Sequence, residues 1–295
     1  YAFQEMTTKL NSKPELRDVI IPSNFNVACR RPTPGNGYLE ALAGEKSTVF
    51  TTTIQEITET GVIDSASGKE HAVDVIICAT GFDTSFRPRF PIVGLDPNTT
   101  LAEKWAEFPA SYLGIGVDGF PNYFSFSGPF TPVAQGSLLP IISILTNHFV
   151  AIIKKMRTRH IRRLSPKPHV VQDFAEHART FLPRTCWADP CSSWFKQGTK
   201  SGPIVMWPGS RLSFFEILEH PSYEDYDIEY WGNNRWSFMG TGFVDYEFTG
   251  TRDLTWYLDT LSERQDWVQR GPFKQDPDEF KNVRTGGLPA IKIDG

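Results

Sequence analysis

Short apolar runs alternate with long polar loops along the chain, and these runs predict the order of its elements. Residues 1–11 have the pattern of a helix that ends before Pro14, and a loop rich in proline and glycine follows as far as Gly37. Two runs of β-branched residues over 48–63, with a turn at 66–68, predict a hairpin-like antiparallel sheet.

Val73–Ala79 is apolar on both faces, as expected for a strand covered on both sides by other layers. It runs into Thr80 and Gly81, where glycine permits an unusual φ and a close approach of main chain to a ligand. A second strand pattern, Tyr123–Ser127, ends in Gly128-Pro129, and a long apolar helix is predicted to begin near residues 135–139. This order predicts an α/β domain that holds a ligand at its strand ends. The alternatives are a tight turn under a packed helix at Gly81 and a plain strand-to-helix turn at Gly128.

A further helix is predicted over Val170–Phe181, with one apolar face formed by Phe174, Ala175, Ala178 and Phe181. The apolar stretch Leu138–Ile153 is interrupted by Pro140, Asn147 and His148, and it is shorter than the roughly 20 residues of a membrane span. We therefore expect a buried helix and no membrane span. The basic residues between Lys154 and Arg163 are expected at the solvated end of this helix.

Composition adds limits on function. The chain has 295 residues, 40% of them hydrophobic and 22% charged, and a formal net charge of -4, which is ordinary for a soluble globular protein. This charge gives no reason to expect nucleic acid as a partner. The sequence shows no signal peptide, and a cytoplasmic location is expected.

The four cysteines are too few for a disulfide scaffold, and neither they nor the six histidines have metal-site spacing, so no metal is expected. Cys186 and Cys191 are close enough in sequence to bridge, but spacing alone cannot show a bond. Buried, reduced thiols are the favoured interpretation. "GIGVDG" at Gly114–Gly119 matches a dinucleotide fingerprint by letters only, because Phe120-Pro121 stops any following helix.

Three segments carry a resemblance to a known family: "DVIICATGFD" at 74–83, "CRRPTPGNGYLEAL" upstream of it and "GFPNYFSFSGP" downstream. Together they resemble the C-terminal half of flavin-dependent Baeyer-Villiger monooxygenases and flavin-containing monooxygenases. "RTCWADPCSSWFKQG" and "MWPGS" resemble the fungal branch. The resemblance covers roughly residues 1–245.

The resemblance implies an α/β fold, namely the C-terminal portion of a Rossmann-like flavoprotein with two dinucleotide-binding domains. It also implies FAD and NADP(H) as cofactors and a peroxyflavin that transfers one oxygen atom from O2. The partners would be O2 and a small hydrophobic organic substrate, a ketone in the Baeyer-Villiger reaction or a compound with a soft nitrogen or sulfur. The cofactor supplies the reactivity, and the protein supplies position and charge.

The matching positions imply site residues. Arg31 would be the catalytic cation beside the peroxide, since guanidinium stays charged at any working pH, and Arg30 would approach the NADP phosphate. Cofactor contacts are implied for Ala79, Thr80, Gly81, Asp83, Gly128, Pro129, Gly136, Ser137, Leu138 and Trp194. Among these, Asp83 would anchor its turn, and free amides at the helix start would bond the flavin carbonyls.

The family's N-terminal FAD fingerprint is absent, so the sequence is interpreted as a fragment that alone binds FAD weakly or not at all. The expected divisions are residues 1–72 as the end of the NADP-binding domain with a helical lead-in, 73–220 as the C-terminal part of the FAD-binding domain, and 221–295 as an aromatic-rich extension with a less ordered tail. Two alternatives stay open: a non-enzymatic binding module with exposed apolar surface, and another pyridine-nucleotide flavoprotein that uses the Cys186, Cys191 pair as a redox disulfide.

Overall fold

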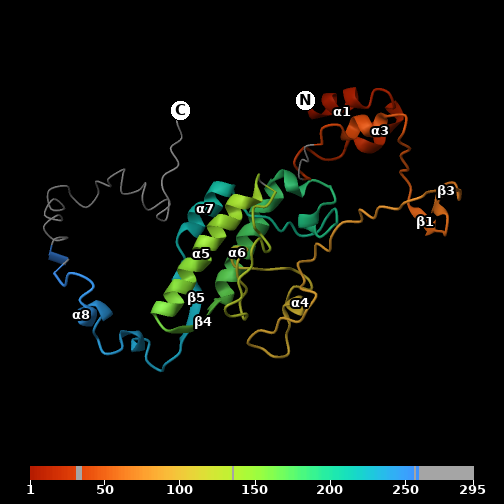
Figure 1. Cartoon of the computed structure of the whole chain (residues 1–295). Coiled ribbons are helices and arrows are strands. Elements are labelled where there is room, and N and C mark those ends of the chain that lie inside the picture. The colour runs from red at the N-terminus through yellow and green to blue at the C-terminus, as the bar shows by residue number, and fades with distance from the viewer. Residues whose placement is uncertain (31–34, 135, 256, 259–295) are drawn as a thin grey trace. The chain divides into compact units, whose positions relative to one another are not determined.

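The structure is a computed structural model that describes residues 1–30, 35–134, 136–255 and 257–258 (Figure 1). The chain divides into two compact units, and each is assembled from stretches that are separated in the sequence. Unit 1 contains residues 1–92, 99–110 and 173–208. Unit 2 contains residues 93–98, 111–172 and 209–295. The expected divisions at 72 and 220 stay predictions.

Unit 1 opens with a small helical cluster. Its elements are α1 (Ala2–Lys9), η1 (Pro14–Leu16), α2 (Arg17–Ile20) and α3 (Tyr38–Ala43), so the predicted helix before Pro14 is confirmed. Leu10, Leu16, Ile21 and Ala43 form its buried apolar centre. Lys13 fixes the chain that follows α3, because its Nζ donates to the carbonyl oxygens of Gly44 and Ser47 at 2.7 and 2.6 Å.

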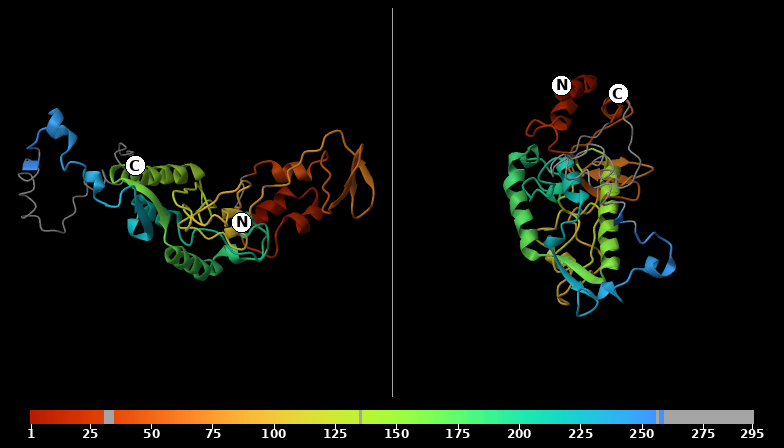
Figure 2. Two further views of the ribbon diagram at one scale, coloured as in Figure 1. Left: turned by 90° about the horizontal axis from the view of Figure 1, so that it is seen from below. Right: turned by 90° about the vertical axis from the view of Figure 1, so that its left-hand side faces the viewer.

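The predicted hairpin-like sheet is confirmed as three antiparallel strands in the order β1 (Ile54–Ile57), β2 (Gly61–Asp64) and β3 (Glu70–Ala72). Asp64 organises the β2–β3 turn, since its Oδ1 accepts from the backbone N–H groups of Ala66 and Ser67 at 3.0 Å each. The left view of Figure 2 shows this sheet as an orange element separate from the red helices.

The prediction of a doubly covered strand at Val73–Ala79 is wrong for this structure. These residues form no strand, and all seven of them are exposed, including Val75 at 75% and Ile77 at 87%. A strand needs neighbours that pair its backbone groups and cover its side chains. The described residues place no strand beside this segment, so it runs as uncovered extended chain.

The rest of unit 1 contains short elements. α4 (Leu101–Lys104) begins with a capping box, in which Thr100 and Glu103 each accept from the other's backbone N–H. The predicted helix at 170–181 is confirmed as α6 (Pro168–Phe181), which begins in the residues of unit 2 and ends in those of unit 1. Three 3-10 turns follow it: η2 (Leu182–Arg184), η3 (Cys186–Ala188) and η4 (Trp194–Lys196).

The expectation that the cysteines are reduced is wrong for one pair. Cys29 and Cys191 form a disulfide across 162 positions, with 6.2 Å between their Cα atoms, whereas Cys78 and Cys186 are free and exposed. The pairing considered from sequence, Cys186 with Cys191, is therefore also wrong. Sequence spacing gave no signal for the observed pair, because only the fold brings residues so far apart into bonding distance.

Unit 2 is built on α5 (Leu138–Thr158), the predicted long apolar helix. It packs with α7 (Arg211–Glu219) and with β4 (Ile161–Pro166), which pairs antiparallel with β5 (Tyr226–Tyr230) (Figure 1). The buried side chains of α5 lie at helical spacing: Ile141, Leu145, His148, Phe149 and Ile152.

The expectation of a buried helix holds for only one face of α5. Leu139 is 72% exposed and Ile153 is 54% exposed, so the apolar character continues around the helix while burial does not. By length and composition α5 could also cross a membrane, a criterion that the core helix of a soluble protein meets as well.

The predicted strand at Tyr123–Ser127 is wrong, because residues 123–125 have no regular structure and residues 126–127 form a turn. Asn122, just before this segment, and Ser127, its last residue, have φ of +59° and +56°, which are left-handed values incompatible with a strand. The remaining elements of the extension are short: η5 (Tyr223–Asp225), η6 (Ser237–Met239) and α8 (Asp245–Thr249). The tail predicted to be less ordered lies outside the described residues.

Candidate functional site

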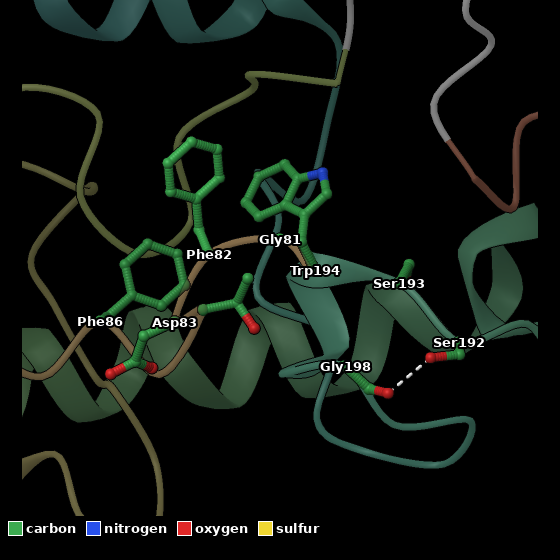
Figure 3. Close-up of a pocket in the computed structure, with 9 residues that line it drawn as sticks. Gly81, Phe82, Asp83, Phe86, Ser192, Ser193, Trp194 and Gly198 are labelled. Atoms are coloured by element: carbon green, nitrogen blue, oxygen red, sulfur yellow. Dashed lines mark hydrogen bonds between the residues drawn. The ribbon is translucent and has the colours of Figure 1, made fainter. Parts of the chain in front are cut away.

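A cavity of about 610 Å³ in unit 1 joins two segments that are more than 100 positions apart in sequence (Figure 3). One segment directly follows the uncovered chain at 73–79, and the other follows the disulfide cysteine Cys191. The lining residues are Gly81, Phe82, Asp83, Thr84, Phe86, Ser192, Ser193, Trp194 and Gly198. Three aromatic rings and a few polar groups therefore surround one space.

Three of the predicted site residues meet at this cavity: Gly81, Asp83 and Trp194. Ala79 and Thr80 lie immediately before it in the chain and are exposed. Sequence reasoning did not name Phe82, Phe86, Ser192 or Ser193, although each lies within three residues of a predicted position. Proximity in sequence was the signal that could have found them.

Gly81 is required by its backbone conformation rather than by lack of room. Its φ is +88°, a left-handed value that favours glycine, whereas a Cβ added there would meet nothing within 4 Å. The neighbouring Asp83 closes a local turn, because its Oδ1 accepts from the backbone N–H of Ser85 at 2.9 Å. Hydrogen bonds from the Ser85 hydroxyl and amide lower the pKa of Asp83, so the carboxylate is ionised at neutral pH.

The opposite wall is held by its own hydrogen bonds. The Ser192 hydroxyl donates to the carbonyl oxygen of Gly198 at 2.5 Å (Figure 3). Beneath this wall the Lys196 side chain is almost fully buried, and its Nζ donates to the carbonyl oxygens of Asp189 and Lys200 at 2.6 and 3.2 Å. Burial lowers the pKa of Lys196. Trp194 is thus presented from a short segment that is anchored at both ends.

Ser193 differs from its neighbours. The residue is 8% exposed, and its buried hydroxyl oxygen has no hydrogen-bond partner among the described residues. An unpaired buried hydroxyl is costly, because it has given up its hydrogen bonds to water.

Arg30 lies beside this wall. Its Nε donates to the carbonyl oxygen of Ser192 at 2.8 Å, and its guanidinium lies 5.8 Å from the ring centroid of Phe25. Arg31, the predicted catalytic cation, lies outside the described residues. One of the two predicted arginines therefore touches a residue that lines the cavity.

The remaining predicted residues belong to unit 2. Gly128 is packed against its own chain: its N–H donates to the carbonyl oxygen of Gly114 at 3.1 Å, and a Cβ there would lie 2.6 Å from the same oxygen. Pro129 accepts from the Ser111 hydroxyl at 2.8 Å. Close packing within unit 2 accounts for glycine at position 128.

Gly136, Ser137 and Leu138 form the start of α5. Gly136 has φ of +82°, and Ser137 is the N-cap without a side-chain cap bond. Arg211, which sequence reasoning missed, donates from Nη2 to the Ser137 carbonyl oxygen at 2.5 Å, and its buried Nε has no hydrogen-bond partner in the described part of the chain. A helix start and a guanidinium thus place positive potential together.

No family model matches the chain. It is 37% identical to the FAD-binding monooxygenase moxY of Dothistroma septosporum over 229 residues, which are 78% of this chain and 36% of the relative. It is 32% identical to a Baeyer-Villiger monooxygenase of Pseudomonas aeruginosa over 203 residues, which are 68% of this chain and 38% of the relative. The chain therefore spans less than half the length of these curated relatives.

Among solved structures, the chain matches an oxidized steroid monooxygenase bound to NADP with a TM-score of 0.66 and 24% identity. The match covers 77% of this chain and 44% of that protein. The fold of the chain is therefore part of the fold of these monooxygenases, as the sequence predicted.

Proposed function

The chain belongs to the family of FAD-binding, Baeyer-Villiger-type monooxygenases, to which it is homologous over about three quarters of its length, and we propose that it forms part of an FAD- and NADPH-dependent enzyme of this family. The reaction would insert one oxygen atom of O2 into a small hydrophobic organic substrate, beside a ketone carbonyl or onto nitrogen or sulfur. The observation that carries the proposal is the cavity that joins Gly81, Asp83 and Trp194.

The cavity fits one flat ring of a dinucleotide. Phe82, Phe86 and Trp194 offer aromatic faces for stacking, and the unpartnered Ser193 hydroxyl could bond to an amide group. The ionised Asp83 suits the positive charge of an oxidised nicotinamide ring. We therefore assign the nicotinamide end of NADP to this cavity.

In this proposal Arg30 and Arg31 each stabilise a different negative charge. Arg30 binds the NADP phosphate, a role that its exposed position beside Ser192 of the cavity wall supports. Arg31 is proposed as the catalytic cation, because a fixed guanidinium stabilises the negative charge that develops on oxygen.

The start of α5 fits a flavin ring. The first amides of a helix have no partner within the helix, and Arg211 adds a guanidinium whose Nε is unpaired among the described residues. Both can bond the ring carbonyl oxygens, which gain negative charge on reduction. The bound flavin would supply the redox chemistry, and Gly136, Ser137 and Leu138 would orient it. Ala79, Thr80, Gly128 and Pro129 are retained as proposed cofactor contacts.

The observed disulfide argues against the alternative of a pyridine-nucleotide flavoprotein that uses Cys186 and Cys191 as a redox pair. Cys191 is bonded to Cys29 and not to Cys186, so the C-x4-C pair is not formed. A non-enzymatic binding module stays the second candidate, because the exposed apolar residues at 73–77 offer surface to a partner.

The test replaces the corresponding part of a full-length relative with residues 1–245 of this chain. The chimera is expected to keep yellow flavin through gel filtration, to oxidise NADPH and to form an oxygenated product detectable by mass spectrometry. The unmodified relative is the control. A chimera that folds by circular dichroism but loses its flavin, or that oxidises NADPH without product, would contradict the proposal.

A further inference from the structure

We propose that the Cys29–Cys191 disulfide is a redox-sensitive clamp that holds the loop carrying Arg30 against the wall of the cavity. The bond joins the two segments directly, because Cys29 precedes Arg30 and Cys191 precedes Ser192, whose carbonyl oxygen accepts from Arg30. The clamp itself requires no cofactor. Only its effect on the reaction rests on the proposed function.

Contacts on either side of the bond connect the same two segments. The Asp189 carboxylate accepts from both the backbone N–H and the side-chain amide of Asn26, at 2.7 Å each. The Cys29 sulfur lies 3.3 Å from the Asp189 carbonyl oxygen, which accepts a hydrogen bond from the buried Lys196. Asp189 is therefore a positioning residue of the clamp, because it holds Asn26 of the arginine loop beside the Cys191 segment.

The arginine loop depends on these contacts because it has no regular structure of its own. Residues 21–30 form neither helix nor strand, and Val27 is 70% exposed. Ala28 has φ of +78°, a conformation that a residue with a Cβ keeps only where its surroundings impose it. The covalent bond at the next residue is the strongest of those constraints.

The redox step is a thiol–disulfide exchange. A dithiol reductant attacks one sulfur, the Cys29–Cys191 bond breaks, and the reductant leaves as its cyclic disulfide while both cysteines take up protons. Both cysteines are buried, so the exchange requires a local opening of the exposed loop. In a reducing compartment such bonds are usually transient and regulatory, which agrees with a switch rather than a permanent staple.

Cleavage of the bond removes the covalent link, and the hydrogen bonds of Asn26 and Arg30 still connect the two segments. Arg30, at 2.8 Å from the Ser192 carbonyl oxygen, is exposed, and solvent competes for such a bond. We therefore expect the reduced loop to leave the cavity wall for much of the time, and the contact between Arg30 and Ser192 to be lost with it.

The first experiment counts thiols and identifies the bond. The oxidised 295-residue chain is expected to expose two reactive thiols, Cys78 and Cys186, and to give four after reduction and unfolding. Non-reducing peptide mapping should then link the peptides that contain Cys29 and Cys191. If glutathione disulfide instead links Cys186 to Cys191, or leaves all four cysteines as thiols, the clamp is excluded.

The second experiment measures hydrogen exchange by mass spectrometry before and after treatment with dithiothreitol. Amides of residues 23–30 should exchange about tenfold faster or more after reduction, while those of the β1–β3 sheet stay unchanged. Without reductant, residues 23–30 of the Cys29→Ser, Cys191→Ser double variant should exchange as fast as in the reduced protein. In the Cys186→Ser variant they should exchange as slowly as in the oxidised protein. Equal exchange of the loop in both states would overturn the proposal even if the disulfide exists. Neither readout depends on flavin, so the clamp and the proposed function fail separately.

Discussion

The backbone N–H of Gly128 donates to the carbonyl oxygen of Gly114 at 3.1 Å, and this pair brings two loops of unit 2 into direct main-chain contact. Gly114 has φ of +77°, and a Cβ there would lie 2.6 Å from the Thr131 hydroxyl oxygen. The two loops therefore lie so close together that neither position has room for a Cβ.

Gly128→Ala is expected to destabilise the protein by about 1–3 kcal/mol, because the added methyl would lie 2.6 Å from the Gly114 carbonyl oxygen. Urea unfolding would measure the change. Gly232→Ala is the matched control in the same unit, since its nearest contact would be an ordinary 3.4 Å. Equal stability of the two variants would show that the loops relax freely.

Lys196→Met should lower the free energy of unfolding by about 1–3 kcal/mol, because two carbonyl oxygens at 189 and 200 lose their buried donor. The exposed Lys200→Met gives the control for lysine replacement. Tryptophan fluorescence during urea unfolding follows the change near Trp194. If Lys196→Met leaves the free energy of unfolding unchanged, water replaces the amine as the donor to the two carbonyl oxygens.

His148 should make stability depend on pH. Its Nδ1 lies 2.8 Å from the Leu218 carbonyl oxygen, so Nδ1 carries the proton, and burial lowers the pKa of the ring below its ordinary 6.5. Between the lowered pKa and 6.5 the unfolded chain binds a proton that the folded chain does not. The contribution of the neutral His148 to the free energy of unfolding is therefore fully present above pH 6.5, and it decreases as the pH falls below 6.5.

The check on His148 is a series of melting temperatures between pH 8 and the acid range. His148→Asn keeps a donor near the Leu218 carbonyl oxygen but cannot titrate, so part of the pH dependence should disappear. His169→Asn, at an exposed histidine, should keep the wild-type curve. If all three proteins show the same curve, other groups control the pH dependence.

The uncovered segment should govern association of the isolated chain. Val75 and Ile77 are 75% and 87% exposed, and replacing both with lysine should raise the protein concentration at which light scattering increases. Val19→Lys, at an exposed valine of α2, is the control for added charge. If both variants behave alike, net charge rather than this segment limits solubility.

Arg31→Ala in the full-length chimera should leave reduction of the flavin by NADPH largely intact and reduce product formation by at least about 100-fold. Stopped-flow absorbance measures the first step, and product analysis measures the second. Arg31→Lys tests the guanidinium itself, since lysine keeps the charge but not the planar fork. An unchanged product yield in Arg31→Ala would remove the catalytic role.

The sequence predicted those elements whose signal is local. α5 and α6 have apolar faces at helical spacing, and the β1–β3 sheet has its turn residues in place. It failed at 73–79 and 123–127, where β-branched or aromatic runs indicate strands only if neighbours exist to pair with them. Local composition cannot supply that information.

At the site, the resemblance named Gly81, Asp83 and Trp194, and the structure gathers them in one cavity. The disulfide and the role of Asp189 could not be predicted, because both depend on contacts across about 160 residues. Arg211 was missed for the same reason: "WPGSR" has no feature that indicates a position beside the start of α5.

The span of the Cys29–Cys191 bond has a consequence for limited proteolysis. A protease that cuts the backbone once anywhere between residues 29 and 191 leaves two pieces that are still joined by the sulfur bridge. Such a nicked chain should migrate as one species on a gel without reductant and separate into two bands only when reductant is added. The exposed residues at 73–77 are a natural place for that cut.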